Sequence, residues 1–289
     1  MAQARELRRR IKSVQSTRQI TRTMEMVSTS KLKRAQDRVI GARPYAVALG
    51  EVLGELYAPD LAERFPLLRR LEAGAIRTAA LLLITSNRGL CGAFNANLIR
   101  EARRRVQALE AQGARVDLHL VGRKGVNFFR FAKRAAASTR IDVGDKPTAQ
   151  HAAQLVEPLI AQFEAGALDA VEIVFAKFNS AVSTPPTTLR ILPVTPPEAG
   201  TRQRSRFFIL KPSAEAILEQ LLPLYVRNQV YRALVETAAA EHGARRTAMK
   251  NATDSAGDML DSLRRTFNRA RQAQITQEIA EIVGGAEAL

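Results

Sequence analysis

One short turn, residues 86–92 with the sequence SNRGLCG, combines glycines, polar side chains and a thiol, and so could bind a phosphate or hold a nucleophile. The turn follows an apolar run and precedes a helical segment, and phosphates are bound at this kind of place in α/β proteins. It has neither the G-x-G-x-x-G spacing nor the G-K-[ST] ending of the known phosphate-binding loops. The pattern favours a tight structural turn, and a nucleotide-dependent enzyme stays as the alternative.

Cys91, the only cysteine of the chain, lies in this turn. A cysteine nucleophile needs a base that a third group holds in place. The only histidines, His119, His151 and His242, belong to no recognisable motif with Cys91, and their isolation also makes them poor zinc ligands. We therefore predict a buried structural thiol, with no catalytic residue, no metal and no cofactor. A lone cysteine excludes an intramolecular disulfide and fits a reducing compartment.

Around the turn, strand-like apolar runs alternate with helical segments. Strands are predicted at residues 79–85, 116–121, near 141, 171–178, 187–194 and 207–210, and helices at 93–111, 124–133 and 148–164. This alternation predicts βαβ units on a largely parallel sheet. We assign residues 75–195 to a Rossmann-like α/β domain.

The two ends of the chain have a different composition. All twelve prolines lie between Pro44 and Pro223, and proline costs about 3 kcal/mol inside a helix, so prolines are expected to mark the joints between the parts. Long helices are predicted over residues 1–57 and 212–289, the second with Ser213 as a plausible N-cap and Glu215 in its first turn.

Both terminal segments show helical periodicity. In the first, apolar or small residues recur in steps of four and three: Leu7, Ile11, Val14, Thr21, Ser28, Leu32, Ala35 and Val39. Two further positions of this heptad seam are occupied by charged residues, Arg18 and Glu25. A second short stripe on a shifted face holds Ile20, Met24 and Val27. The C-terminal series is Leu218, Leu222, Leu234, Ala238, Ala248, Ala252, Met259, Leu263, Ile275, Ile279 and Ile282.

Helices this long need a partner, and the obvious partner of each is the other. Val14 is expected to lie opposite the stretch from Leu263 to Ala270, and Leu263, Ile275 and Ile279 are expected to supply core contacts. The expected fold class is α+α/β: an antiparallel coiled coil of the N- and C-terminal helices with a central Rossmann-like domain.

The chain is strongly basic, with 44 Lys and Arg against 28 Asp and Glu, a net charge of +16 and a pI near 10.9. The first 43 residues alone carry a net charge of +9. Such a field attracts nucleic acid, anionic lipid or an acidic protein socket. The long helices carry almost no base-stacking aromatics and no nucleic-acid motif. A basic coiled-coil nucleic-acid binder is kept as the alternative to a protein that sits in an acidic sleeve. The longest apolar run, residues 79–84, is far too short to span a bilayer.

Three segments carry a resemblance to a known family, the gamma subunits of F-type ATP synthases. They are IKSVQSTRQIT and MEMVSTSKL in residues 11–32, TSNRGLCGAFN in residues 85–95, and AMKNATD, NRARQAQITQEI and EIVGGA between residues 248 and 286. The resemblance covers the whole chain in order, and the C-terminal motif is highly specific.

The resemblance implies a non-catalytic central rotor shaft that couples proton flow through a membrane ring to ATP synthesis and hydrolysis. Its implied partners are the alpha and beta subunits of the catalytic head, the epsilon subunit and the c-subunit ring, with no nucleic acid, no direct ATP binding and membrane contact only through partners. The family's beta-subunit contacts fall on Met24, beside an acidic lever of beta, and on Arg271, Gln272 and Thr276, which would hydrogen-bond a beta loop.

The sequence departs from the family's pattern at Lys211, where an acidic residue is common in the run before Pro212-Ser213, so contacts near the foot are in question. The regulatory cysteine insert of chloroplast relatives is absent and no transit peptide is apparent. A bacterial protein on the cytoplasmic face of the plasma (inner) membrane is expected.

Overall fold

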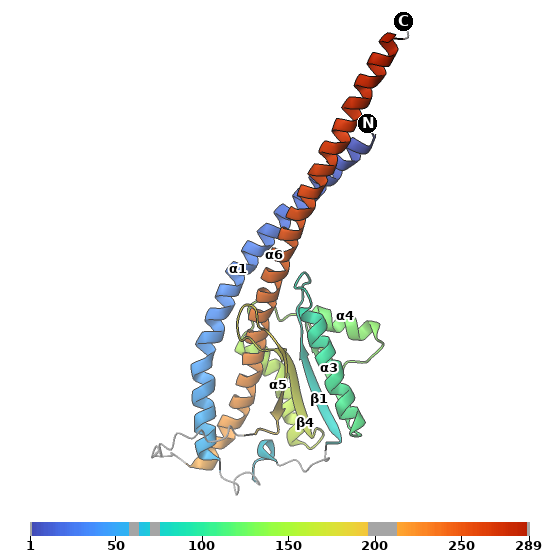
Figure 1. Ribbon diagram of the computed structural model, residues 1–289. Helices are drawn as coiled ribbons and strands as arrows, with labels where there is room; N and C mark the ends of the chain where they lie inside the picture. Colours follow the sequence, from blue (N-terminus) through green and yellow to red (C-terminus); the bar gives the residue numbers. More distant parts are fainter. Residues whose placement is uncertain (1, 58–63, 70–75, 196–212, 288–289) are drawn as a thin grey trace. The chain divides into compact units, whose positions relative to one another are not determined.

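The computed structural model describes residues 2–57, 64–69, 76–195 and 213–287 (Figure 1). The strand expected at residues 207–210 and Lys211 lie outside these residues. The chain divides into two compact units: Met1–Thr29 with Arg245–Leu289, and Ser30–Ala244. Two long helices, α1 (Ala2–Leu56) and α6 (Ala214–Glu287), run through both units.

The long helices form as their composition predicts, and the N-cap of α6 is confirmed because the Ser213 hydroxyl accepts a hydrogen bond from the Ala216 amide (3.2 Å). Prolines do not limit them: α1 continues through Pro44 and α6 through Pro223. The expectation that prolines mark the joints is therefore wrong at these two positions. Each proline removes one intrahelical hydrogen bond, and buried leucines on either side, such as Leu53 of α1, hold the helices in place.

The larger unit contains a five-stranded sheet in the order β3-β2-β1-β4-β5. Its strands are β1 (Thr78–Ile84), β2 (Arg115–Val121), β3 (Ser138–Arg140), β4 (Ala170–Ala176) and β5 (Pro186–Leu192). The first four are parallel, and β5 pairs antiparallel with β4. The helices are α3 (Phe94–Ala111), α4 (Arg123–Phe131) and α5 (Ala149–Glu164), with a short 3-10 turn η1 (Pro66–Leu68). The expected Rossmann-like alternation is confirmed.

Alternate residues of β1 point into two different cores. Leu82 and its neighbours on one face pack against α5 and against residues 218–234 of α6. Leu81 and Leu83 on the other face pack against α3 and α4, and this core also takes in residues 32–39 of α1 and 235–240 of α6. The long helices of this unit are thus part of the cores of the α/β domain.

In the smaller unit the ends of α1 and α6 pair antiparallel, as predicted. The Arg8 guanidinium lies 5.7 Å from the Phe267 ring centroid, that of Arg18 lies beside Gly257, and Thr21 bonds Thr253. Positions rise along one helix as they fall along the other. This register places Val14 opposite about residue 261, slightly before the expected stretch.

Burial confirms the heptad series of α1 and corrects that of α6. Thr21 and Ser28 are buried as the series requires. On α6 the buried seam is Met249, Thr253, Ala256 and Leu260, whereas Met259 is 54% exposed. The expected series from Ala248 to Met259 was displaced by one residue. It assigned the apolar Ala252 and Met259 to the seam, whereas the buried residues are Thr253 and Leu260.

Candidate functional site

The turn after β1 is held by hydrogen bonds among its own residues. The Asn95 side chain accepts from the Ser86 amide (3.0 Å) and donates to the Ser86 hydroxyl (2.8 Å). The Ser86 hydroxyl in turn donates to the carbonyl of Arg88 (2.6 Å). A polar network closed in this way has its groups committed to the fold, as expected of a structural turn.

The same turn caps the helix that follows β2. The first three amides of α4 donate to the turn: Arg123 to the Asn87 side chain (2.9 Å), Lys124 to the Ser86 carbonyl (3.1 Å) and Gly125 to the Thr85 hydroxyl (2.9 Å). A helix N-terminus binds phosphate through these free amides. Here the chain itself uses them.

Gly122 allows this close approach. Its φ is 94°, and a Cβ on it would lie 2.1 Å from the Thr85 carbonyl oxygen. The backbone after β2 therefore packs directly on the backbone after β1. We attribute the glycine at this position to that contact.

Cys91 is buried as predicted, and its sulfur accepts a hydrogen bond from the Asn95 side-chain amide (3.1 Å). The histidines lie apart in the structure: His119 bonds the Ser138 hydroxyl (2.7 Å), and His151 caps α5 at Thr148. His242 is buried on α6. Among the described residues no cluster of three His, Cys, Asp or Glu side chains could hold a metal ion.

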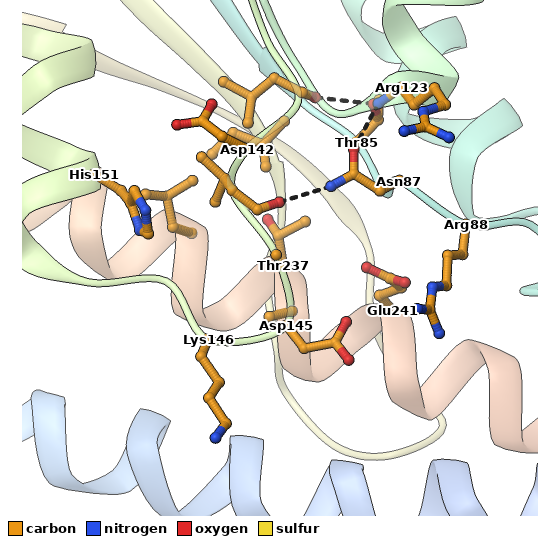
Figure 2. Close-up of a pocket in the computed structure, with 16 residues that line it drawn as sticks. Thr85, Asn87, Arg88, Arg123, Asp142, Asp145, Lys146, His151, Thr237 and Glu241 are labelled. Carbon is orange, nitrogen blue, oxygen red and sulfur yellow. Dashed lines mark hydrogen bonds between the residues drawn. The ribbon is translucent and has the colours of Figure 1, made fainter.

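A cavity of about 690 Å³ opens at the carboxyl ends of β1 and β2 and is closed on one side by α6 (Figure 2). Its charged lining residues are Arg88, Arg123, Asp142, Asp145, Lys146, His151 and Glu241. Figure 2 shows the Lys146 side chain directed away from Arg123, so these two cations do not converge on one point in the cavity.

The carboxylates of this cavity bond to neighbouring cations. The Arg140 guanidinium bonds Asp142 and lowers the pKa of that carboxyl to about 2. Burial raises the pKa of Asp145, but the ion pair with Lys31 and the nearby His242 and Arg88 together outweigh it, so the net shift is downward. The cavity is lined by charges of both signs, and two of its carboxylates are paired, which is unlike the cradle of backbone amides that binds a nucleotide phosphate.

The residues expected to contact a beta subunit fall at two places on the helix pair. Met24 is half-buried on α1. Arg271, Gln272 and Thr276 are exposed near the end of α6. By the register of the pair, the two places are about 30 Å apart along the axis, at 1.5 Å per residue. The structure brings Gln272 and Thr276 together on one face, with the Thr276 hydroxyl donating to the Gln272 carbonyl (3.0 Å).

The core role expected of Ile275 and Ile279 is wrong. Their exposed fractions are 46% and 56%, and Ile282 is 72% exposed. The register places position 3 of α1 opposite position 272 of α6, so no described residue of α1 lies beside α6 beyond about position 273. These isoleucines form an exposed apolar stripe at the end of α6, and Leu260 (1% exposed) is the deeper seam residue.

Sequence reasoning missed the polar contacts that fasten the sheet to α6. The Glu236 carboxylate accepts from the Phe178 amide (3.0 Å), and the Thr237 hydroxyl accepts from the Ala176 amide (3.3 Å). Their signal in the sequence is a Glu-Thr pair inside an otherwise apolar stretch of a helix, VETAAA.

Two features of the described residues define a class of protein. The N-terminal part of α1 pairs antiparallel with the C-terminal part of α6, and both long helices also contribute to the cores of a Rossmann-like domain. No described helix is long and apolar enough to cross a membrane. The model of one protein family, described as ATP synthase, matches residues 3–289. The chain belongs to the ATP synthase gamma chain family.

Relatives agree with this assignment. The ATP synthase gamma chain of Gemmatimonas aurantiaca is 64% identical over 290 residues, covering 100% of this chain and 99% of the relative. That of Moorella thermoacetica is 46% identical over 289 residues and covers both chains fully. The comparisons give no support to the nucleic-acid alternative.

Solved structures agree on the fold. A chain in the central stalk and c-ring of the Tetrahymena thermophila mitochondrial ATP synthase has a TM-score of 0.61 at 26% identity, over 81% of this chain and 99% of that one. A chain of the Euglena gracilis mitochondrial enzyme in rotational state 3 has a TM-score of 0.67 at 19% identity, over 99% of this chain and 94% of that one, which shows the fold.

Proposed function

We propose that this chain is the central rotor shaft of an ATP synthase, coupling proton flow through the membrane ring to ATP synthesis and hydrolysis in the head. It is a non-catalytic subunit of that complex. Its partners are the alpha and beta subunits, the epsilon subunit and the c-subunit ring. The observation that carries the proposal is the antiparallel pair in the smaller unit, in which α6 extends past the start of α1 and its residues Gln272, Ile275 and Thr276 are exposed.

The contacts with a beta subunit are part of this proposal. Arg271, Gln272 and Thr276 stand on an exposed stretch of α6, where a partner can reach them. A guanidinium presents a fork of donors to a carboxylate, and Gln272 can both donate and accept. Met24 would meet an acidic segment of beta further along the pair. Next to it on α1, Ile20 and Val27 are more than half exposed and would add apolar contact.

The proposal also divides the chain by role. Residues 1–57 and 212–289 would form the shaft, and residues 75–195 the domain that meets epsilon and the ring. The protein is peripheral to the membrane. We place it on the cytoplasmic face of a bacterial inner membrane, because the two relatives described above are bacterial.

The test is reconstitution. This chain, tagged, is co-expressed with the other subunits of its own ATP synthase, and inverted membrane vesicles are assayed for ATP-driven acidification. The expected result is copurification of alpha, beta, epsilon and c subunits with this chain, and acidification that depends on it. Vesicles that pump equally well when the chain is omitted would contradict the proposal.

A further inference from the structure

Two loops at the carboxyl edge of the sheet are each held by both long helices. The first loop follows β4. The amide of Phe178 donates to Glu236 of α6 (3.0 Å), and the carbonyl of the same residue accepts from Arg43 of α1 (3.4 Å). Phe178, in the loop that follows β4, is thus bonded by both long helices.

The second loop precedes α5 and contains Asp145. Its carboxylate pairs with Lys31 of α1, and its backbone carbonyl accepts from Arg38 of α1 (3.1 Å). From α6, the Nε2 atom of His242 lies 3.8 Å from the same carboxylate. This loop also is attached to both helices. All of these residues belong to the larger unit.

The α6 side of these contacts is deeply buried. Glu236 is 1% exposed, and its second oxygen accepts from Arg232 (2.8 Å), so bonds to both oxygens hold the orientation of the carboxylate. About two turns further on, Gly243 lets the loop after β4 approach closely, since a Cβ there would lie 3.0 Å from the Ala181 carbonyl oxygen. The attachment points on α6 are about 9 Å apart along its axis.

We propose that these two attachments, at Phe178 and Asp145, are the elements that transmit torque between the α/β domain and the two long helices. The proposal rests on the proposed rotor function. The hydrophobic effect that holds the long helices in the cores is non-directional, whereas hydrogen bonds also fix orientation because they depend on angle. Two directional contacts at different heights on the same helices oppose twisting of the domain around them. Lys31, Arg43 and Glu236 are therefore positioning residues of the coupling machinery.

The experiment uses the assembled complex in inverted vesicles and compares variants at the attachments with a matched control. The test variant is the double Lys31→Ala/Arg43→Ala, which removes the ion pair to Asp145 and the hydrogen bond to Phe178. The Arg38 bond to the Asp145 carbonyl remains, so each attachment loses one contact with α1. The control is Arg190→Ala, which removes a partly exposed cation from the buried Glu172 while Arg105 still bonds that carboxylate. Glu236→Ala removes the α6 side in a second test, and Lys31→Arg/Arg43→Lys restores the cations.

The readout is the number of protons pumped per ATP hydrolysed, together with the torsional stiffness of single rotors probed on the α/β domain. We expect the Lys31→Ala/Arg43→Ala complex to hydrolyse ATP at the control's rate while its pumping ratio and stiffness are at least halved. Glu236→Ala should behave in the same way, and the cation-restoring double should recover. A pumping ratio equal to that of Arg190→Ala in both test variants would overturn the inference. Failure of the wild-type complex to assemble or pump would instead overturn the proposed function.

Discussion

The hydroxyl of Thr253 on α6 lies 2.8 Å from the hydroxyl of Thr21 on α1, and both side chains are buried in the seam of the helix pair. Each hydroxyl also lies within hydrogen-bond distance of a carbonyl of its own helix, Met249 for Thr253 (2.8 Å) and Arg18 for Thr21 (3.0 Å). A buried polar pair of this kind favours one register of the two helices, because a slip breaks the hydroxyl–hydroxyl contact and places each hydroxyl against apolar groups.

The first prediction concerns the unequal cost of removing one hydroxyl or both. Thr253→Val leaves Thr21 facing an apolar group, and we expect it to lower the free energy of unfolding by about 1 kcal/mol. The double Thr21→Val/Thr253→Val removes both polar groups and should recover most of that loss. Chemical denaturation of the three proteins measures both values. Losses that simply add in the double would show that the two hydroxyls do not interact.

A second prediction tests the antiparallel register. Thr21→Cys/Thr253→Cys in a Cys91→Ser background should form an intramolecular disulfide under mild oxidation, because the side-chain oxygens they replace lie 2.8 Å apart. The matched control is Thr21→Cys with Lys250→Cys, since Lys250 is exposed on α6. Non-reducing electrophoresis with mass spectrometry reads the result. Cross-links between two chains in place of within one would contradict the antiparallel pair.

The sequence predicted most of the fold because its patterns are local. The apolar run of β1, the alternation around it and the heptads of α1 each report a short-range regularity, and the structure confirms them. The seam of α6 was displaced because Thr253 is polar: hydropathy alone does not show that a threonine has a buried partner 232 residues away.

The exposure of the isoleucines near the end of α6 could not be predicted for a different reason. Ile275 and Ile279 have helical core spacing, and only the register of the pair reveals that no residue of α1 lies opposite them. The contacts of Glu236 were likewise invisible, because a buried carboxylate is recognised only when its donor, the Phe178 amide, is placed beside it.

A third prediction separates backbone strain from steric overlap. Gly122 and Gly113 both have positive φ, 94° and 84°, but only Gly122 has atoms within contact distance of a new Cβ. Gly113→Ala should cost about 1 kcal/mol of strain. Gly122→Ala should cost clearly more, because its Cβ would overlap the Thr85 carbonyl. Thermal unfolding of both variants checks the order, and equal melting temperatures would refute the steric argument.

A fourth prediction concerns pH. Burial lowers the pKa of His119, against a smaller opposing effect of Asp117. The folded protein therefore holds this proton less tightly than the unfolded chain, whose histidines titrate near 6.5. The contribution to stability is complete above about pH 6.5 and is lost as the pH falls through the folded pKa, by less than about 1 kcal/mol because the ring is half-exposed.

His119→Gln should accordingly lose less stability than the parent between about pH 7.5 and 5.5, around the ordinary histidine pKa. Melting temperatures across this range, for parent and variant in the same buffers, make the comparison. His151→Gln is a control on the surface of the same domain. A parent and a His119→Gln variant with identical pH profiles would rule out the assignment.

The last prediction is that Arg271 acts in coupling and Leu260 in folding. Arg271 is exposed, so Arg271→Ala leaves the seam of the helix pair intact. In the assembled complex its guanidinium would meet a beta subunit, where a charge-assisted hydrogen bond contributes about 1.5–3 kcal/mol. Assembly should be normal, with ATP turnover and proton pumping both reduced.

Leu260→Ala, in contrast, removes a buried side chain and should lower the free energy of unfolding by about 2–5 kcal/mol. Assembly and ATP-driven pumping measured in the same membranes separate the two roles. Unchanged turnover and pumping by Arg271→Ala would remove its assigned contact, and failed assembly would make the residue structural.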